Sequence, residues 1–275
     1  MASMTVAEIH GKISEQGTNL SDRMEDLLTS DVFGCLRYLS PEKTLMPFLS
    51  TARSFHGHPL ALPTEVETVH YSFWPWVGSP GCKPCEPDIV VGLQTEKKCL
   101  YLILIEAKYH SGLSSLEDEN ESPNDQLARE LDNLNTVSPM NLRWSPDLKI
   151  ISRYLLFVTQ DMGMPRRLVA QSLAEYQRKR SNQGDIYWTS WRFLLPILEK
   201  NLKQENSPQT IAVMGDMLEL LLRKGLGVFR GVDPITIRFS MPQFYFKPRR
   251  VYTWPIVPAQ IRVNFKYEVR ENGRE

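Results

Sequence analysis

Residues 87–109 read PDIVVGLQTEKKCLYLILIEAKY, and this stretch decides the fold class. It contains two apolar runs of strand length that are joined by the polar turn 94–98. Short apolar runs rich in β-branched residues on either side of a polar turn predict a β-hairpin. We therefore expect strands over 88–93 and 99–109 that lie next to each other in a sheet.

Charged side chains mark the ends of this hairpin. Asp88 opens the first strand, and Glu106 and Lys108 close the second, which is the most apolar strand of the chain. Side chains alternate across a strand, so Glu106 and Lys108 share one face. Ile105 and Ala107 take the other. In a hairpin, Asp88 and Glu106 can lie side by side. Two close carboxylates repel each other unless a cation lies between them, and such oxygen ligands suit Mg²⁺ or Mn²⁺.

Pro87-Asp88, followed by a strand that ends in Glu106-Ala107-Lys108, resembles the signature of the PD-(D/E)XK nuclease superfamily. This group includes many restriction endonucleases, repair nucleases and transposon nucleases, and the resemblance covers residues 20–160. It implies an α/β restriction-endonuclease-like core, in which helices flank a mixed central β-sheet. It also implies a magnesium-dependent nuclease that hydrolyses phosphodiester bonds in DNA and leaves a 5′-phosphate, in restriction, defence or DNA processing. RNA is not excluded as a substrate.

The resemblance assigns a role to each residue of the motif. Asp88 and Glu106 would bind Mg²⁺ or Mn²⁺, and the Ala107 carbonyl would complete the metal's ligands. Such a metal polarises a phosphoryl oxygen and lowers the pKa of a bound water. Lys108 would orient or deprotonate the attacking water, or stabilise the charge that builds on the phosphate.

Glu25 is a further metal-ligand candidate, because family members often carry a Glu on the helix before the core. Leu28, Val32 and Leu36 recur at helical spacing in a helix expected over 22–39. Glu25 extends this core-facing stripe. The alternative is that Glu25 forms a capping box with Asp22 at the start of that helix.

Gln126 is a candidate because some family members carry a Gln on the helix after the Glu-x-Lys strand. If the leucines of this helix face the sheet, Gln126 faces the site together with Glu130. The alternative is that Gln126 lies on a solvated helix edge. The family's Gln motif often has a Tyr four residues on, where this chain has Glu130, so membership of that subgroup stays open.

Two partial copies of the motif occur elsewhere in the chain. Glu96-Lys97-Lys98 also matches Glu-x-Lys, but it falls in the polar turn of the hairpin. Pro146-Asp147 has no Glu-x-Lys strand after it. Only the pairing of Asp88 with Glu106 and Lys108 puts both halves of the motif on strands.

The remaining elements follow from hydrophobic periodicity and turn residues. We expect strands over 64–74 and 150–159; helices around Leu127–Leu134 and over 165–180, 191–202 and 210–224; and a β-like segment from Ile235 onward. The resulting domain prediction is an N-terminal segment 1–20, a nuclease core 21–162, and C-terminal helices and strands 163–275 packed on the core.

Acidic and basic residues balance at 32 each, so a nucleic acid must be met by a local basic surface rather than by net charge. Two basic clusters are candidates for contacts with phosphate groups. The first is on the helix expected over 165–180, and the second is near the C-terminus. The candidates are Arg166, Arg167, Arg178, Lys179, Arg180, Lys247, Arg249 and Arg250.

The sequence shows no apolar N-terminal signal region and no stretch of membrane-spanning length, so we expect a cytoplasmic protein without a membrane partner. Its four cysteines do not suggest a disulfide framework. Cys82 and Cys85 form half of a zinc knuckle whose second half is missing.

Two other function classes compete with a nuclease. One is a catalytically inactive nuclease-like subunit that binds nucleic acid or a partner protein. The other is a scaffold whose charged strand residues form a structural ion pair. Sequence specificity, endo- or exonucleolytic action, and assembly into a homodimer or larger complex are not decided by the sequence.

Overall fold

A computed structural model describes residues 20–78, 82–109, 124–180 and 184–227. Contacts divide the chain into two units, 1–228 and 229–275, and every described residue belongs to the first. The expected β-like segment from Ile235, with Lys247, Arg249 and Arg250, lies outside the described residues.

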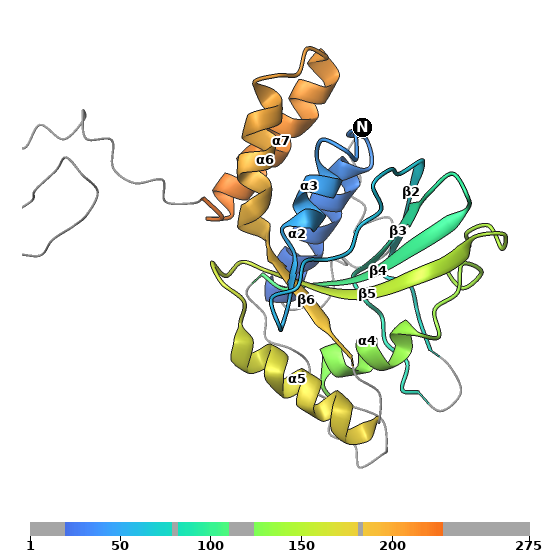
Figure 1. The fold of residues 1–275 in the computed structure, drawn as a ribbon. Helices are drawn as coiled ribbons and strands as arrows, with labels where there is room; N and C mark the ends of the chain where they lie inside the picture. The colour runs from blue at the N-terminus through green and yellow to red at the C-terminus, as the bar shows by residue number, and fades with distance from the viewer. Residues whose placement is uncertain (1–19, 79–81, 110–123, 181–183, 228–275) are drawn as a thin grey trace, which may run out of the picture. The chain divides into compact units, whose positions relative to one another are not determined.

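One mixed sheet of six strands forms the centre of the described unit, in the order β1-β6-β5-β4-β3-β2 (Figure 1). Strand β4 is central; it pairs antiparallel with β3 and parallel with β5. The strands are β1 (Arg53–Ser54), β2 (Thr68–Phe73), β3 (Ile89–Gln94), β4 (Cys99–Ala107), β5 (Lys149–Thr159) and β6 (Ile186–Ser190). The protein is therefore an α/β protein with a mixed sheet, and the hairpin predicted around residues 94–98 is confirmed.

Helices cover both faces of this sheet. Figure 1 shows one group of helices above the strands and a second group below them. The first group is α2 (Leu20–Leu36), α3 (Leu45–Ser50), α6 (Leu194–Leu202) and α7 (Pro208–Arg223), and the second is α4 (Gln126–Leu134) and α5 (Arg166–Lys179). The side chains of β4 alternate between the two layers. Ile103 and Ile105 pack in the core with α2, and Leu102 and Leu104 pack in the core with α4.

Several boundaries differ from the expected ones. Helix α2 begins at Leu20 and ends at Leu36, so Asp22 lies inside the helix rather than at its N-cap. The predicted capping box of Asp22 and Glu25 is wrong for that reason. Strand β2 begins only at Thr68, and helix α3, which contains Pro47, was not predicted.

The sheet continues beyond residue 162. Strand β6 was not predicted, yet it pairs parallel with β5 from Leu155↔Ile186 to Thr159↔Ser190. A one-turn helix, η1 (Trp191–Phe193), follows it directly. The segment assigned to a C-terminal extension therefore supplies one strand of the central sheet.

Trp191 is the largest fully buried side chain of the described core. Its ring lies 5.8 Å from Phe33 of α2 and 6.3 Å from Phe48 of α3, measured between ring centroids. This side chain therefore ties the end of β6 to the helices that cover one face of the sheet.

We expect Trp191→Ala to lower the free energy of unfolding by about 3–5 kcal/mol, because it opens a large cavity between the sheet and α2. The matched control is Trp76→Ala, since the side chain of Trp76 is 69% exposed; its effect should stay within about 0.5 kcal/mol. Urea unfolding, monitored by circular dichroism, measures the free energy of unfolding of both variants. Equal effects of the two variants would contradict the packing described for Trp191.

Candidate metal centre

The hairpin register places two acidic side chains beside each other. Ile89 of β3 pairs with Ile105 of β4, so the next pair toward the end of the hairpin sets Asp88 opposite Glu106. The backbone N–H of Ala107 donates to Asp88 Oδ2 at 2.8 Å, which fixes the Asp88 carboxyl against the end of β4. Both side chains are buried, at 7% and 1% exposure. The structure thus brings Asp88 and Glu106 together, as the alternation along the hairpin predicts.

Glu25 approaches Asp88 and Glu106 at the end of β4 from the opposite face of the sheet. Its Oε1 accepts a hydrogen bond from Lys108 Nζ at 2.8 Å, and its Oε2 accepts one from the backbone N–H of Tyr109 at 3.0 Å. The neighbouring residues of α2, among them Leu28 and Val32, pack in the core on that opposite face. The end of β4 is therefore the point at which side chains from both layers meet.

The three acids form a compact oxygen cluster. One carboxylate oxygen from each of Glu25, Asp88 and Glu106 lies within 4.8 Å of the other two. Among the residues that the structure describes, no other group of three or more acidic, histidine or cysteine side chains meets this condition. Lys108 lies against the cluster, with its Nζ 2.6 Å from Glu106 Oε1.

Helix α4 adds Gln126 to the cluster. The side chain of Asp125 caps this helix by accepting a hydrogen bond from the N–H of Ala128 at 3.0 Å. Gln126, the first helical residue, donates from Nε2 to Glu106 Oε1 at 2.6 Å. The structure thus places Gln126 on the cluster rather than on a solvated helix edge.

Glu130 is a fourth acid that was not among the predicted site residues. It is completely buried on α4, one helical turn beyond Gln126, and its carboxyl lies within hydrogen-bonding reach of that of Glu106. The signal was present in the sequence, because residues four apart on a helix share a face. An acidic residue on a helix is ordinarily solvated, however, so its burial was not expected.

Burial and mutual repulsion raise the pKa of Asp88, Glu106 and Glu130. Burial raises the pKa of Asp88 well above its usual range, and the negative charge of Glu106 raises it further. Burial and the charge of Glu130 do the same to the pKa of Glu106. Burial, followed by the charge of Asp88, raises the pKa of Glu130 to about 7. Burial alone would lower the pKa of Lys108, but Glu106, Asp88 and Glu25 together raise it above its ordinary value.

The residues fit a hard cation. Among the described residues, Glu106 Oε2 and both carboxyl oxygens of Glu130 are buried without a hydrogen-bond partner. Unsatisfied buried carboxyl oxygens are costly, and either a proton shared by Glu106 and Glu130 or a bound cation compensates them. The donor set consists of carboxylate oxygens, which is the preference of Mg²⁺ and Mn²⁺ rather than of Zn²⁺.

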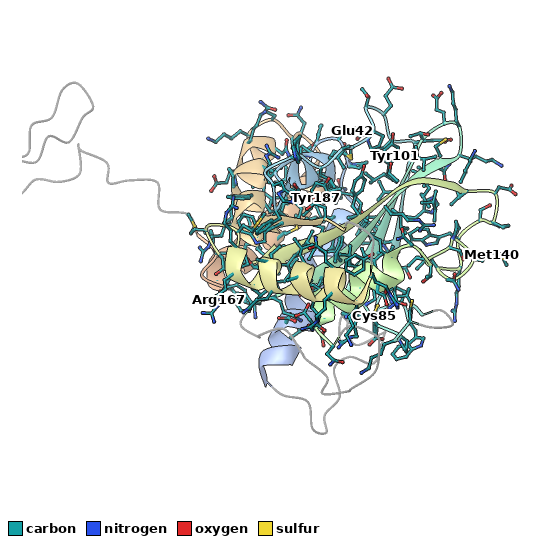
Figure 2. All side chains as sticks on the ribbon, turned by 60° about the horizontal axis from the view of Figure 1, so that its bottom comes forward. Glu42, Cys85, Tyr101, Met140, Arg167 and Tyr187 are labelled. Atoms are coloured by element: carbon teal, nitrogen blue, oxygen red, sulfur yellow. The ribbon has the colours of Figure 1, made fainter. Side chains whose placement is uncertain are left out.

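The predicted basic residues of α5 do not form one patch. Arg166 and Arg167 are exposed at the start of the helix, where Arg166 donates to the backbone carbonyl of Phe55 at 3.4 Å; Figure 2 labels Arg167. Arg178 and Lys179 end the helix, about 20 Å away at 1.5 Å per residue. Arg180 is held in a two-point ion pair with Asp132, at 2.5 and 2.8 Å. The backbone N–H of Asp125, next to Gln126, donates to Glu175 at 3.2 Å, so the later half of α5 lies beside the start of α4.

Cys82 and Cys85 lie next to α4 and are both free thiols. Cys85 is buried in a bridge with Val77, and burial, followed by the charge of Glu130, raises its pKa. The Asn133 side chain donates to the backbone carbonyl of Lys83 at 2.7 Å. The segment 82–85 therefore covers α4, and the described residues hold no cysteine cluster suited to a metal.

Comparisons with family models, with curated proteins and with solved structures find no match for the chain. No helix of the described part is long and apolar enough to cross a membrane.

The free energy of unfolding in chelator should fall as the pH rises from about 4.5 to above 7. Glu130 keeps its proton in the folded state up to a pKa of about 7, whereas its ordinary value is 4.5. This stability is present below the unfolded pKa and is lost as the pH rises through the folded one. The difference corresponds to about 3 kcal/mol.

Urea unfolding in EDTA at several pH values measures this loss. Glu130→Gln should reduce the pH dependence, of which Asp88 and Glu106 supply the remainder, and Glu96→Gln, at the exposed tip of the hairpin, should leave it unchanged. Stability that rises with pH over this range would contradict the buried acid cluster.

Proposed function

We propose that this chain is a metal-dependent nuclease of the PD-(D/E)XK superfamily that hydrolyses phosphodiester bonds in DNA. The observation that carries the proposal is the cluster at the end of β4. Oxygens of Glu25, Asp88 and Glu106 lie within 4.8 Å of one another, and Lys108 contacts two of these acids. This is the set of residues that the family's motif assigns to its active site.

The arrangement of elements supports a restriction-endonuclease-like core. A helix carrying Glu25 precedes the β3–β4 hairpin, β5 lies parallel to β4, and α4 connects β4 to β5 on the face opposite α2. The motif acids lie at the end of the central strand rather than at a solvated turn. Both partial copies of the motif lie in exposed positions: Glu96 is exposed, and Asp147 pairs with Lys98 at the surface.

Asp88, Glu106 and Glu25 would hold the metal, with the Ala107 carbonyl as a further ligand. A bound Mg²⁺ or Mn²⁺ supplies polarisation of the phosphoryl oxygen and a lower pKa for water. Asp88 is held in place by the Ala107 N–H, and Glu106 by Gln126 and Lys108. The ligands are thus fixed before any cation arrives, which is the arrangement that favours binding and catalysis.

Lys108 suits a role as a donor to the phosphate. The surrounding acids raise its pKa, so it carries a full positive charge in the metal-free protein. An ammonium at this position stabilises the negative charge that builds on the phosphoryl oxygens. In the reaction, a water oxygen bonds to phosphorus while the bond from phosphorus to the 3′ oxygen breaks. The water proton passes to solvent, the 3′ oxygen takes up a proton, and the 5′-phosphate remains.

A structural ion pair explains the cluster less well than a metal centre. One lysine cannot neutralise Glu25, Asp88, Glu106 and Glu130, and burying the surplus negative charge is unfavourable. A catalytically inactive nuclease-like subunit that binds nucleic acid or a partner protein is the second candidate. The complete set of motif residues favours the enzyme, since a purely binding role does not require buried acids.

Plasmid and linear DNA should be cleaved with Mg²⁺ or Mn²⁺ and not with EDTA. We expect Asp88→Asn and Lys108→Met each to lower the rate by at least about 100-fold, since the first removes a metal ligand and the second removes the ammonium. Gel electrophoresis of the products measures the rate.

The partial motif copies provide matched controls for this experiment. Asp147→Asn and Glu96→Gln change the same residue types at exposed positions and should retain full activity. If the wild-type protein cleaves no DNA or RNA with any divalent metal, and matches Asp88→Asn throughout, the nuclease proposal fails.

Arg167 should contribute to DNA binding. It is exposed at the start of α5, as Arg178 is at its end, so the two residues test opposite ends of the helix as contacts with phosphate groups. Arg167→Ala should weaken binding and reduce the salt dependence of the binding constant by about one phosphate contact. Fluorescence anisotropy of labelled DNA in Ca²⁺ at several salt concentrations measures this. A larger effect of Arg178→Ala would place the DNA elsewhere.

A further inference from the structure

We propose that Lys224 and Arg192 form a phosphate-binding subsite beside the acid cluster. The subsite would hold a phosphate of the nucleic acid next to the one that is cleaved. This inference rests on the proposed function, and it names two residues that the superfamily motif does not contain.

Tyr109 connects the subsite to the acid cluster. It follows Lys108 directly in the chain, and its backbone N–H donates to Glu25 Oε2 at 3.0 Å. At the far end of its side chain, the Tyr109 hydroxyl donates to the backbone carbonyl of Lys224. Tyr109 therefore spans the distance between a candidate metal ligand and the C-terminal end of α7.

Two cations lie against Tyr109. Lys224 Nζ lies over the face of its ring, 5.6 Å from the ring centroid. Burial raises the pKa of Tyr109 and the positive charge of Arg192 opposes that rise, so the guanidinium is close enough to act on the hydroxyl. Lys224 and Arg192 are both half-buried. Two positive charges therefore surround the same tyrosine that binds Glu25.

Backbone carbonyls hold Arg192 in place. Its Nε donates to the carbonyl of Gln160 at 2.7 Å. Its Nη1 donates to the carbonyls of Gly225 and Gly227, at 3.0 and 2.7 Å, just beyond the end of α7. Arg192 thus caps this helix, at the end where a cation is favourable. Neutral carbonyls fix the guanidinium but leave its full charge uncompensated.

No carboxylate of the described residues pairs with either cation. Glu25, the acid bound to Tyr109, forms its ion pair with Lys108. Helix capping accounts for Arg192, but it does not account for the Lys224 ammonium, whose described contact is the ring of Tyr109. A half-buried positive charge without a counter-charge is unfavourable. An anion from solution would compensate both cations.

A nucleic acid supplies this anion under the proposed function. The acid cluster would hold the metal at the cleaved phosphate, and each neighbouring nucleotide carries a further phosphate with a negative charge. Lysine and arginine side chains are common contacts of the phosphate backbone, and such contacts fix the position of the strand. Lys108 is engaged by Glu25 and Glu106. Lys224 and Arg192 would therefore bind the flanking phosphate.

DNA binding by the full-length protein tests the subsite without cleavage. In Ca²⁺, Lys224→Gln should weaken binding about tenfold at low salt and reduce the salt dependence of the binding constant by about one phosphate contact. Lys224→Arg keeps the positive charge and should restore most of both. Arg192→Gln should act like Lys224→Gln; circular dichroism shows whether it is folded, and the Lys224 variants decide the question if it is not. Fluorescence anisotropy of labelled DNA at several salt concentrations gives the binding constants.

Arg223→Gln is the matched control, because it removes the same charge from the neighbouring residue of α7. Arg223 is exposed and already forms an ion pair with Glu219. Its substitution should leave the salt dependence unchanged. Equal salt dependence in Lys224→Gln and Arg223→Gln would overturn the subsite.

An ester with a single phosphodiester separates a flanking contact from a direct role in cleavage. Bis(p-nitrophenyl) phosphate carries no second phosphate. With Mn²⁺, Lys224→Gln should lower kcat/KM for DNA at least about fivefold more than kcat/KM for this ester, mainly through KM. Equal losses with the two substrates would overturn the assignment to a flanking phosphate.

The outcomes also separate the subsite from the nuclease proposal. Salt-dependent DNA binding that requires Lys224, in a protein that cleaves neither DNA nor RNA with any divalent metal, would support the subsite and reject the nuclease. Metal-dependent cleavage that is lost in Asp88→Asn, with unchanged salt dependence of binding in Lys224→Gln, would support the nuclease and reject the subsite.

Discussion

The buried negative charge at the end of β4 is the main physical constraint on the structure of this protein. Glu25, Asp88, Glu106 and Glu130 converge on the end of β4, where, among the residues that the structure describes, Lys108 forms ion pairs with Glu25 and Glu106. Such a cluster weakens the metal-free fold, because carboxylates lose hydration and repel one another. The remainder of the core compensates for it, and β4 in particular is apolar and buried along almost its whole length. A protein retains an arrangement of this kind for function rather than for stability.

The order of strands around the site followed from local signals. Alternation along residues 87–109 predicted a hairpin, and the hairpin register alone placed Asp88 beside Glu106. Strand β6 could not be recognised in the same way. It has only five residues, and it gains its place through parallel pairing with β5, a long-range contact that leaves little local pattern. Helix α3 was missed because it is a single short helix that contains Pro47.

The candidate site shows the same difference between local signals, which the sequence reveals, and long-range contacts, which it does not. Glu106 and Lys108 are near neighbours in sequence, whereas the contact between Lys108 and Glu25 joins positions 83 residues apart. Glu25 was predicted from the helical stripe and the resemblance, not from any signal for that contact. Glu130 was expected to face the site beside Gln126 if the leucines face the sheet, but it was not named as a site residue, because its burial depends on packing around α4. Leu127 and Leu131 pack in the core with the sheet and α5, and the segment 82–85 lies against Asn133. A polar residue on a helix that is covered on several sides cannot be distinguished by sequence from one that faces water.

The convergence of side chains from both layers at the end of β4 bears on when the acid cluster can form during synthesis of the chain. All of the candidate ligands lie between Glu25 and Glu130, so a ribosome delivers them before it delivers β5 and β6. Strand β4 is central, and without β5 one of its edges has no partner. A nascent or proteolytically shortened chain therefore holds the acids without the framework that gathers them. We expect the acid cluster to form only once β5 and β6 have joined the sheet, so an incomplete chain does not assemble it.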